Sequence, residues 1–232
     1  MTSRWLRMGV IASAALVLVA AYLDFGFAPE DALQGPVQRI FYLHVPAAIA
    51  AYLCFALVLV GSGLYLWHES ATGDRLARAA APVGLLMTSV TFGMGIVWAK
   101  AAWGWDPSQP WDARLTSTAV LWTVYAGYLL VRRLATSGRS AARLSAVVGI
   151  VGFFDVPVVH FSVQWWRTLH PGPVVESGAL PASMLVAFLV SLVAVLVLTV
   201  TMVAARYRIE VLRDAAGDSA PAPLSAPVGA AQ

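Results

Sequence analysis

The sequence predicts an all-α membrane protein, a polytopic bundle of six transmembrane helices with both termini in the cytoplasm. Apolar residues make up 59% of the 232 residues and charged residues only 12%, against roughly 45–50% and about 25% in average proteins. Mean hydropathy is +0.75, and the charges lie between long apolar runs. So few charges could not cover the surface of a soluble protein, which excludes a soluble enzyme, a disordered chain and a disulfide-stapled secreted domain.

Six apolar segments are long enough to cross a bilayer, which takes about 20 mostly apolar residues in a helix. They are residues 8–27, 45–67, 79–99, 115–131, 144–163 and 180–205. Asp24 lies near the end of the first segment and Asp155 lies in the fifth, whereas the other four contain no Asp, Glu, Lys or Arg. None alternates between polar and apolar residues, so helices are favoured over the strands of an outer-membrane barrel.

The orientation follows from the positive charges in the loops. Eleven of the 15 Lys and Arg residues lie on one side of the predicted bundle. The four on the other side are Arg39, Lys100, Arg114 and Arg167. Positively charged loops stay in the cytoplasm, so the side with eleven is cytoplasmic. The first segment also fits a cleaved signal peptide, which would leave five spans.

The chain is predicted to form one domain followed by a tail. Residues 1–213 contain all six spans, and no second domain or internal repeat is evident. Residues 214–232 are rich in Ala, Pro and Ser without apolar periodicity, which predicts a disordered cytoplasmic tail.

The external loops concentrate the aromatic and polar side chains. Five of the nine tryptophans fall in two short external segments. They are Trp103, Trp105, Trp111, Trp165 and Trp166, with Asp112 and Arg114 beside the first group. An aromatic belt would be expected at both membrane interfaces, but the cytoplasmic side has chiefly Trp5 and Trp67. The asymmetry favours an external binding site.

The four histidines differ in position. His44 and His170 lie at the outer ends of different segments, near one membrane depth, whereas His68 begins a cytoplasmic loop. His160 lies within the fifth span, where a packing imidazole and a ligand are equally compatible with the sequence. Two imidazoles with no cysteine beside them are few ligands for a structural zinc site. Two axial nitrogens, aromatic faces and arginines for propionate groups fit a haem.

Three motifs carry a family resemblance. They are R-I-F-Y-L-H-V-P-A-A at 39–48, W-A-K-A-A-W-G-W-D-P-S-Q-P-W-D-A-R-L-T-S at 98–117 and D-V-P-V-V-H-F-S-V-Q-W-W-R-T-L-H-P-G at 155–172. In this order the chain resembles the cytochrome c maturation protein C family, also called haem exporter protein C, whose members share a tryptophan-rich "WWD" segment. The resemblance covers roughly residues 5 to 212. Its second motif is two residues longer here than is usual in the family.

The resemblance implies a haem relay at the periplasmic face of the bacterial cytoplasmic membrane. The cargo would be haem b with two axial histidines, passed to a membrane-anchored periplasmic haem chaperone. A small single-span partner and an ABC transporter would act with the chain in the bilayer. The implied metal ligands are His44 and His170. The other implied haem contacts are Arg39, Trp103, Trp105, Trp111, Asp112, Arg114, Trp165 and Trp166.

Other functions fit the sequence less well. A membrane b-type cytochrome needs histidine pairs well inside the spans, and only His160 lies there. A small-molecule transporter should have polar or broken helices near the midplane of the membrane. Only Asp155 and Pro157 in this sequence indicate such a helix. A related haem synthetase carries further spans and a large external domain. The chain has no nucleophile–base pair and no phosphate-binding loop, so catalysis is not expected. Its net charge is +3, but the positive residues form no basic face, so nucleic-acid binding is not expected either.

The topology can be tested with reporter fusions, because the eleven-to-four distribution of positive charges makes a definite prediction. Fusions after Arg78 and Arg139 should report a cytoplasmic location, and fusions after Pro107 and Gly172 a periplasmic one. A periplasmic signal after Arg139 would contradict both the topology and the external site.

Overall fold

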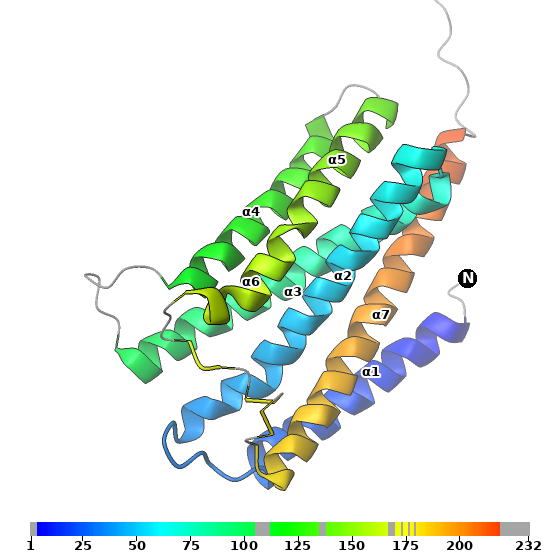
Figure 1. The fold of residues 1–232 in the computed structure, drawn as a ribbon. Coiled ribbons are helices and arrows are strands. Elements are labelled where there is room, and N and C mark those ends of the chain that lie inside the picture. Colours follow the sequence, from blue (N-terminus) through cyan, green and yellow to red (C-terminus); the bar gives the residue numbers. More distant parts are fainter. Residues whose placement is uncertain are drawn as a thin grey trace, which may run out of the picture.

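The computed structural model describes residues 4–104, 112–134, 138–166, 170–172, 174–175, 177–178 and 180–218. The helices are α1 (Arg4–Tyr22), α2 (Phe41–His68), α3 (Ala71–Trp103), α4 (Ala113–Leu134), α5 (Gly138–Phe153), α6 (Asp155–Trp165) and α7 (Ala182–Asp218). A π-helical turn (Leu23–Phe27) extends α1, and a 3-10 helix (Pro36–Ile40) precedes α2. The described residues contain no strand, which confirms the all-α class (Figure 1).

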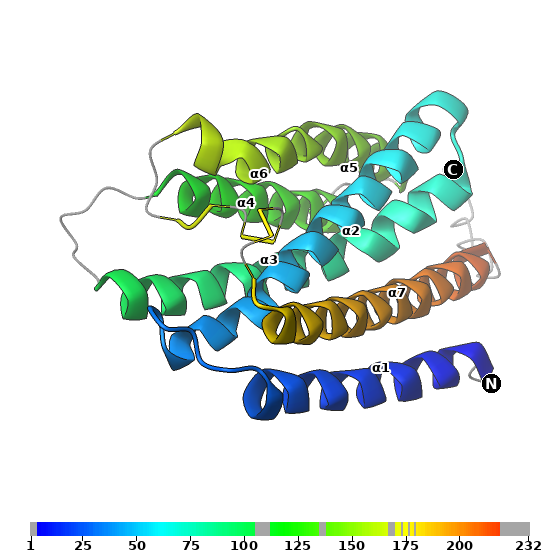
Figure 2. The same cartoon turned by 60° about the horizontal axis from the view of Figure 1, so that its bottom comes forward.

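The helices form one elongated bundle of membrane-spanning rods (Figures 1 and 2). Five segments are long and apolar enough to cross a membrane, and α5 and α6 together make one of them. The other predicted span is α4, which has 22 residues and a more polar composition. Its Ser117 and Thr118 are buried and donate their hydroxyl hydrogens to carbonyl groups one turn earlier. These internal bonds allow polar side chains to lie within a helix that packs inside a membrane protein.

Helix α1 lies at the edge of the bundle and packs along α7 (Figure 2). Asp24, in the π-helical turn, is the buried acid of this contact. Both of its carboxylate oxygens accept from the Ser191 hydroxyl of α7, at 3.0 and 2.9 Å. An acid at membrane depth needs such a partner. The Asp24–Ser191 contact therefore fixes the end of α1 against α7.

Helices α2 and α3 form a tight antiparallel hairpin. Glu69 takes a left-handed conformation with φ of 49°, and the hydroxyl of Ser70 accepts from the N–H of Gly73 at 3.2 Å to cap α3. Beyond the turn, Gly61 and Gly73 bring the two backbones into direct contact. A Cβ atom on Gly61 would lie only 2.5 Å from the Gly73 carbonyl oxygen. Small residues of this kind allow membrane helices to approach closely.

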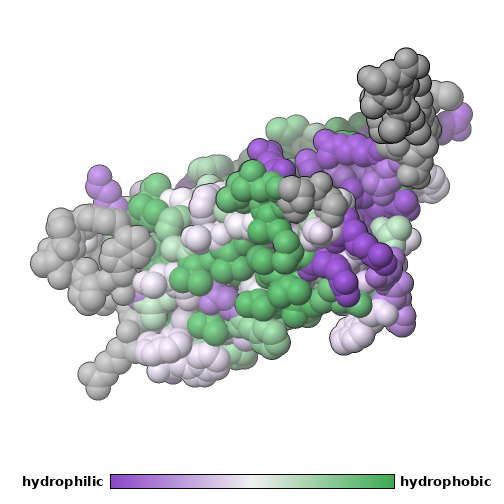
Figure 3. Space-filling model, turned by 90° about the horizontal axis from the view of Figure 1, so that it is seen from above, coloured by the Kyte–Doolittle hydropathy of each residue, from purple (hydrophilic) through white to green (hydrophobic). Residues whose placement is uncertain are grey.

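An ion-pair cluster joins α3, α4 and α7 at the end of the bundle that contains the α2–α3 turn. Its members are Asp74, Arg75, Arg78, Arg132, Glu210 and Asp214. Asp74 pairs with Arg132, and Asp214 accepts from both Arg75 and Arg78 at 2.7 Å. Figure 3 shows hydrophilic side chains gathered on one side of the view from above, next to an apolar surface. We call the end of the molecule that contains this cluster and the α2–α3 turn the ion-pair end.

The ion pairs also explain why the last helix extends beyond the predicted start of the tail. The sequence assigned residues 214–218 to the tail, but α7 continues through Asp218. Asp214 lies on the helix because it binds the two arginines of α3, a contact that the local composition does not reveal. Residues 219–232 lie outside the described residues.

The α2–α3 contact predicts a specific effect of adding one methyl group. Gly61→Ala should destabilise the protein by about 2 kcal/mol, because the new atom meets backbone that cannot move aside. Thermal unfolding in detergent would measure this loss. Gly93→Ala in α3 is the matched control, since a Cβ there meets nothing within 4 Å. Equal melting temperatures for the two variants would contradict the close packing.

Candidate functional site

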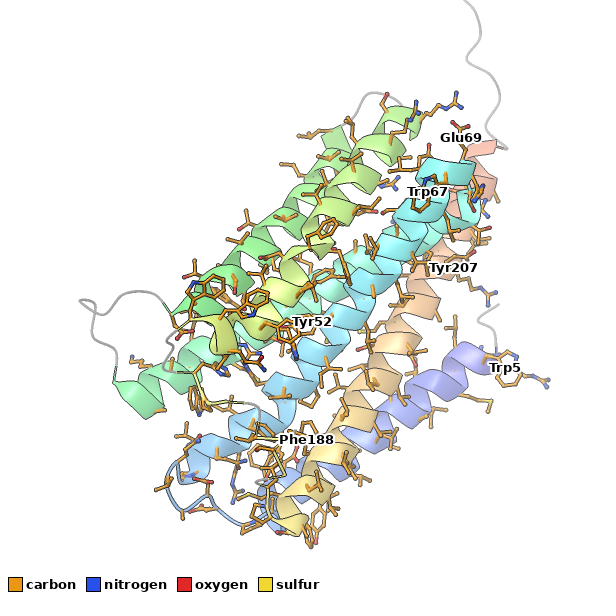
Figure 4. The ribbon with its side chains drawn as sticks, in the orientation of Figure 1. Trp5, Tyr52, Trp67, Glu69, Phe188 and Tyr207 are labelled. Atoms are coloured by element: carbon orange, nitrogen blue, oxygen red, sulfur yellow. The ribbon has the colours of Figure 1, made fainter. Side chains whose placement is uncertain are left out.

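A cavity of about 700 Å³ lies at the end of the bundle opposite the ion-pair end. Residues of α2, α3, α4, α6 and α7 line it, together with parts of the loops before α2 and after α6. Tyr52 of α2 and Phe188 of α7 are two of these residues (Figure 4). The volume falls in the range of about 300–1,000 Å³ that is typical of ligand pockets, which are mostly apolar with a few polar groups.

His44 and His170 both line this cavity and lie close together. Their ring centres are 6.4 Å apart, and the ring planes are inclined by 32°. His44 lies in the first turn of α2. Pro46, two residues later, lies inside the helix, where its missing N–H removes one backbone hydrogen bond. His170 lies in the loop that follows α6. The fold thus brings together two histidines that are 126 positions apart in the sequence.

Gly95 of α3 leaves the space that the His44 ring occupies. A Cβ atom on Gly95 would lie 3.2 Å from Cε1 of His44. The Nδ1 atom of His44 is buried, and no described residue makes a hydrogen bond of normal geometry with it, although the backbone of Thr91 is close by. A buried nitrogen without a hydrogen-bond partner is costly.

His170 lies among polar and aromatic neighbours. Its Nδ1 is 2.9 Å from the Pro171 carbonyl oxygen and 3.3 Å from Nη1 of Arg114. A carbonyl oxygen only accepts, so the shorter contact requires the hydrogen on Nδ1 and leaves the lone pair on Nε2. Burial, followed by the charge of Arg114, lowers the pKa of His170 from its usual value. The imidazole is therefore neutral at pH 7, as metal ligation requires.

Arg114 and Asp112 mark the start of α4 beside the cavity. The Asp112 carboxylate accepts from the N–H of Arg114 at 2.9 Å, which is the bond of a helix N-cap. The Arg114 guanidinium lies beside His170 and donates to the His160 carbonyl oxygen at 3.5 Å. Both residues line the cavity, so the aspartate and arginine that the sequence singled out do meet the histidine pair.

Other predicted site residues lie elsewhere. Arg39 does not line the cavity, because its guanidinium donates to the Phe25 carbonyl at 2.5 Å and pairs with Glu30 at 3.7 Å. Trp165 and Trp166 are exposed at the end of α6, with ring centres 5.8 Å apart, and are not among the cavity residues. Trp103 is the last residue of α3, and its side chain lies outside the description. Trp105, Trp111 and Arg167 lie outside the described residues.

The other two histidines lie in different parts of the molecule. His68 is exposed at the end of α2, near the ion-pair end and far from the cavity. His160 of α6 lines the cavity, with its ring centre 6.4 Å from that of Tyr52 and 4.7 Å from that of Phe161. His160 is thus an aromatic wall residue of the same site.

Sequence reasoning missed four residues that shape the site. They are Gln34, Tyr52, Gly95 and Trp98. Trp98 opens the tryptophan-rich segment, so its motif position was the one available signal. The other three are single residues whose contacts arise only from the packing of distant segments.

The fold and the site define a polytopic membrane protein with a large, mostly apolar cavity and two neighbouring imidazoles at one end of its helical bundle. Comparison of the sequence with known protein families identifies the family. A family model described as "Heme exporter protein C" matches residues 1–220. The chain therefore belongs to the haem exporter protein C family, as the motifs predicted.

Three relatives, all named "Heme exporter protein C", illustrate the similarity. The Bradyrhizobium diazoefficiens protein is 36% identical over 210 residues, covering 88% of this chain and 78% of the relative. The Escherichia coli K12 protein is 37% identical over 163 residues, 70% of this chain and 65% of the relative. The Haemophilus influenzae protein is 31% identical over 205 residues, 86% and 82% respectively. These relatives support a role in haem handling for cytochrome c biogenesis.

The space beside His44 predicts a graded effect at Gly95. Gly95→Ala should weaken the binding of added haem slightly and Gly95→Val about tenfold, because the larger side chain displaces the imidazole ring at an overpacking cost of about 1–3 kcal/mol. Absorption titration of the detergent-purified protein would measure both affinities. Gly93→Val, two residues away and facing open space, is the control. The steric explanation fails if the Gly93 and Gly95 variants bind haem equally well.

Proposed function

We propose that this chain binds haem b at the outer face of the bacterial cytoplasmic membrane and delivers it to a membrane-anchored haem chaperone during cytochrome c maturation. One observation carries the proposal: the ring centres of His44 and His170 lie 6.4 Å apart at the wall of a large, mostly apolar cavity. The family's role in haem handling supplies the identity of the cargo.

The separation of the two rings suits a metal ion between them. A metal–nitrogen bond to imidazole is about 2 Å long, and each nitrogen lies about 1 Å from its ring centre, so two opposed ligands hold their ring centres about 6 Å apart. The observed 6.4 Å is close to this value. His44 and His170 are the proposed axial ligands.

The cavity also suits the rest of a haem molecule. Its wall includes Trp98, Phe188 and Leu192, which offer apolar contact to a macrocycle. Arg114 lies beside the histidine pair, where a guanidinium can form charge-assisted hydrogen bonds with a propionate. Asp112 holds the start of the helix that carries Arg114. Arg39 would have to leave its bonds with Phe25 and Glu30 to reach a propionate.

The proposed role is transfer of the cargo without catalysis of bond formation. The sequence has no phosphate-binding loop, so a step driven by ATP would belong to an ABC transporter acting with the chain. A small single-span protein would complete the membrane complex. The cavity lies at one end of the bundle, where a chaperone outside the membrane could reach the bound haem. The tryptophans at 103–111 would contribute to this surface.

One observation supports a second candidate, a b-type cytochrome with haem deeper in the bundle. His160 lines the same cavity and lies closer to the bundle interior along α6 than the loop that carries His170. In that case His160 would replace His170 as a ligand.

Single histidine variants distinguish the two candidates. His44→Ala and His170→Ala should each lower the haem that co-purifies by at least about tenfold and abolish the bis-imidazole absorption spectrum, because one of two iron bonds is lost. Both should also block transfer to the chaperone. Added imidazole should partly restore the spectrum by filling the vacant coordination position.

Two further histidines serve as controls. His68→Ala should leave the spectrum unchanged, because His68 is exposed at the opposite end of the molecule. His160→Ala should alter haem content mildly and keep the bis-imidazole signature. Loss of that signature in His160→Ala, together with an intact spectrum in His170→Ala, would establish the cytochrome arrangement and overturn the proposal.

A further inference from the structure

The loop between α1 and α2 contains a rigid turn at the rim of the cavity. The Asp31 carboxylate accepts from the backbone N–H groups of Leu33 and Gln34 at 2.9 and 2.8 Å. The Asp31 carbonyl accepts from the N–H of Gly35 at 2.9 Å, and Gly35 has a φ of 57°, which favours glycine. An aspartate that binds the backbone two and three residues ahead fixes a turn. The position of Gln34 is therefore well defined.

Gln34 uses its side chain to hold a tryptophan on another helix. Its Oε1 atom accepts from Nε1–H of Trp98 at 2.9 Å, a bond that joins the turn to α3 across 64 positions of sequence. Indole nitrogen is a donor only, so the oxygen of the amide must face Trp98. Gln34 and Trp98 both line the cavity, and so does Asp31. The turn is thus a part of the cavity wall.

Trp98 in turn contacts the proposed haem ligand of the loop. Its ring centre is 6.0 Å from that of His170, and the two planes are inclined by 48°. Without the bond at one edge, the indole could rotate about its side-chain dihedrals and change the surface that His170 packs against. A hydrogen bond at the indole edge is therefore a means of setting the orientation of an axial imidazole.

We propose that Gln34 is a positioning residue, which acts through Trp98 to fix the His170 imidazole for haem ligation. This inference rests on the proposed function, because it assigns Gln34 a role in the same haem site. Gln34 need not touch the iron, and its effect is expected on ligand orientation as well as on affinity.

The test compares four variants of the full-length protein, purified in detergent and titrated with ferric haem. Gln34→Leu removes the acceptor, Gln34→Glu keeps an acceptor oxygen, and Trp98→Phe removes the donor. The fourth is the Gln34→Leu/Trp98→Phe double variant. Gln34→Leu should weaken haem binding about twofold to fivefold, the range for a solvent-accessible hydrogen bond. Gln34→Glu should restore the affinity of the parent protein.

A second measurement separates positioning from general destabilisation. The electron paramagnetic resonance of low-spin ferric haem responds to the angle between the axial imidazole planes. Its signal should shift in Gln34→Leu and return in Gln34→Glu, while the melting temperature of the haem-free protein stays the same. Ala32→Ser is the matched control, since Ala32 is exposed on the same turn and does not line the cavity.

The outcomes are distinguishable. If the bond is the cause, the double variant should be no worse than the weaker-binding single variant, because both changes remove one interaction. Additive losses, or a Gln34→Leu variant with the affinity and resonance signal of the parent protein, would overturn the assignment of Gln34 while leaving the proposed function intact. A parent protein that binds no haem would overturn both.

Discussion

The direct contact between the backbones of α2 and α3 determines how the rest of the bundle is arranged. At the ion-pair end Gly61 and Gly73 leave no room for any side chain between the two helices. At the other end the His44 ring lies between them and meets Gly95 of α3. The two helices are thus joined by backbone at one end and separated by an imidazole at the other. The cavity lies at the second end.

The membrane environment explains where the polar groups lie. Some buried polar groups within the bundle bond within their own helix, as Thr88 does to the Gly84 carbonyl, and others have a partner on another helix, as Asp24 does with Ser191. The dense ion pairs occur at one end, and the histidines of the candidate site occur at the other. Asp155 is one of several exceptions, because its buried Oδ2, like Nδ1 of His44, has no hydrogen-bond partner among the described residues. It is the first residue of α6, at the break between α5 and α6.

The sequence was sufficient for the fold class, because composition and span length depend on the bilayer and not on tertiary detail. It also placed His44, His170, Asp112 and Arg114 on one side of the bundle, and the structure brings all four to one cavity. The turn before α2 could not be predicted in this way. The Gln34–Trp98 bond joins two segments whose spacing in sequence gives no period or motif.

Other details depend on local partners that the sequence pattern does not reveal. The motif predicts that Arg39 contacts the haem propionates, and in the structure its guanidinium bonds with the Phe25 carbonyl and pairs with Glu30. The end of α7 lies beyond the predicted boundary because Asp214 meets two arginines of α3. Both cases are choices of partner that depend on three-dimensional proximity, which a one-dimensional pattern of charge does not contain.

The two histidines of the cavity differ in how the chain holds them. His44 is part of a 28-residue helix, so moving it requires a helix to shift against its neighbours. His170 belongs to a non-helical segment, where changes in a few backbone dihedrals are enough to displace it. If the pair ligates haem as proposed, one ligand is held by its own helix, whereas the other depends on side-chain contacts such as that with Trp98. Release of the haem would then begin with the bond to His170, so the two ligands would leave the iron in a defined order.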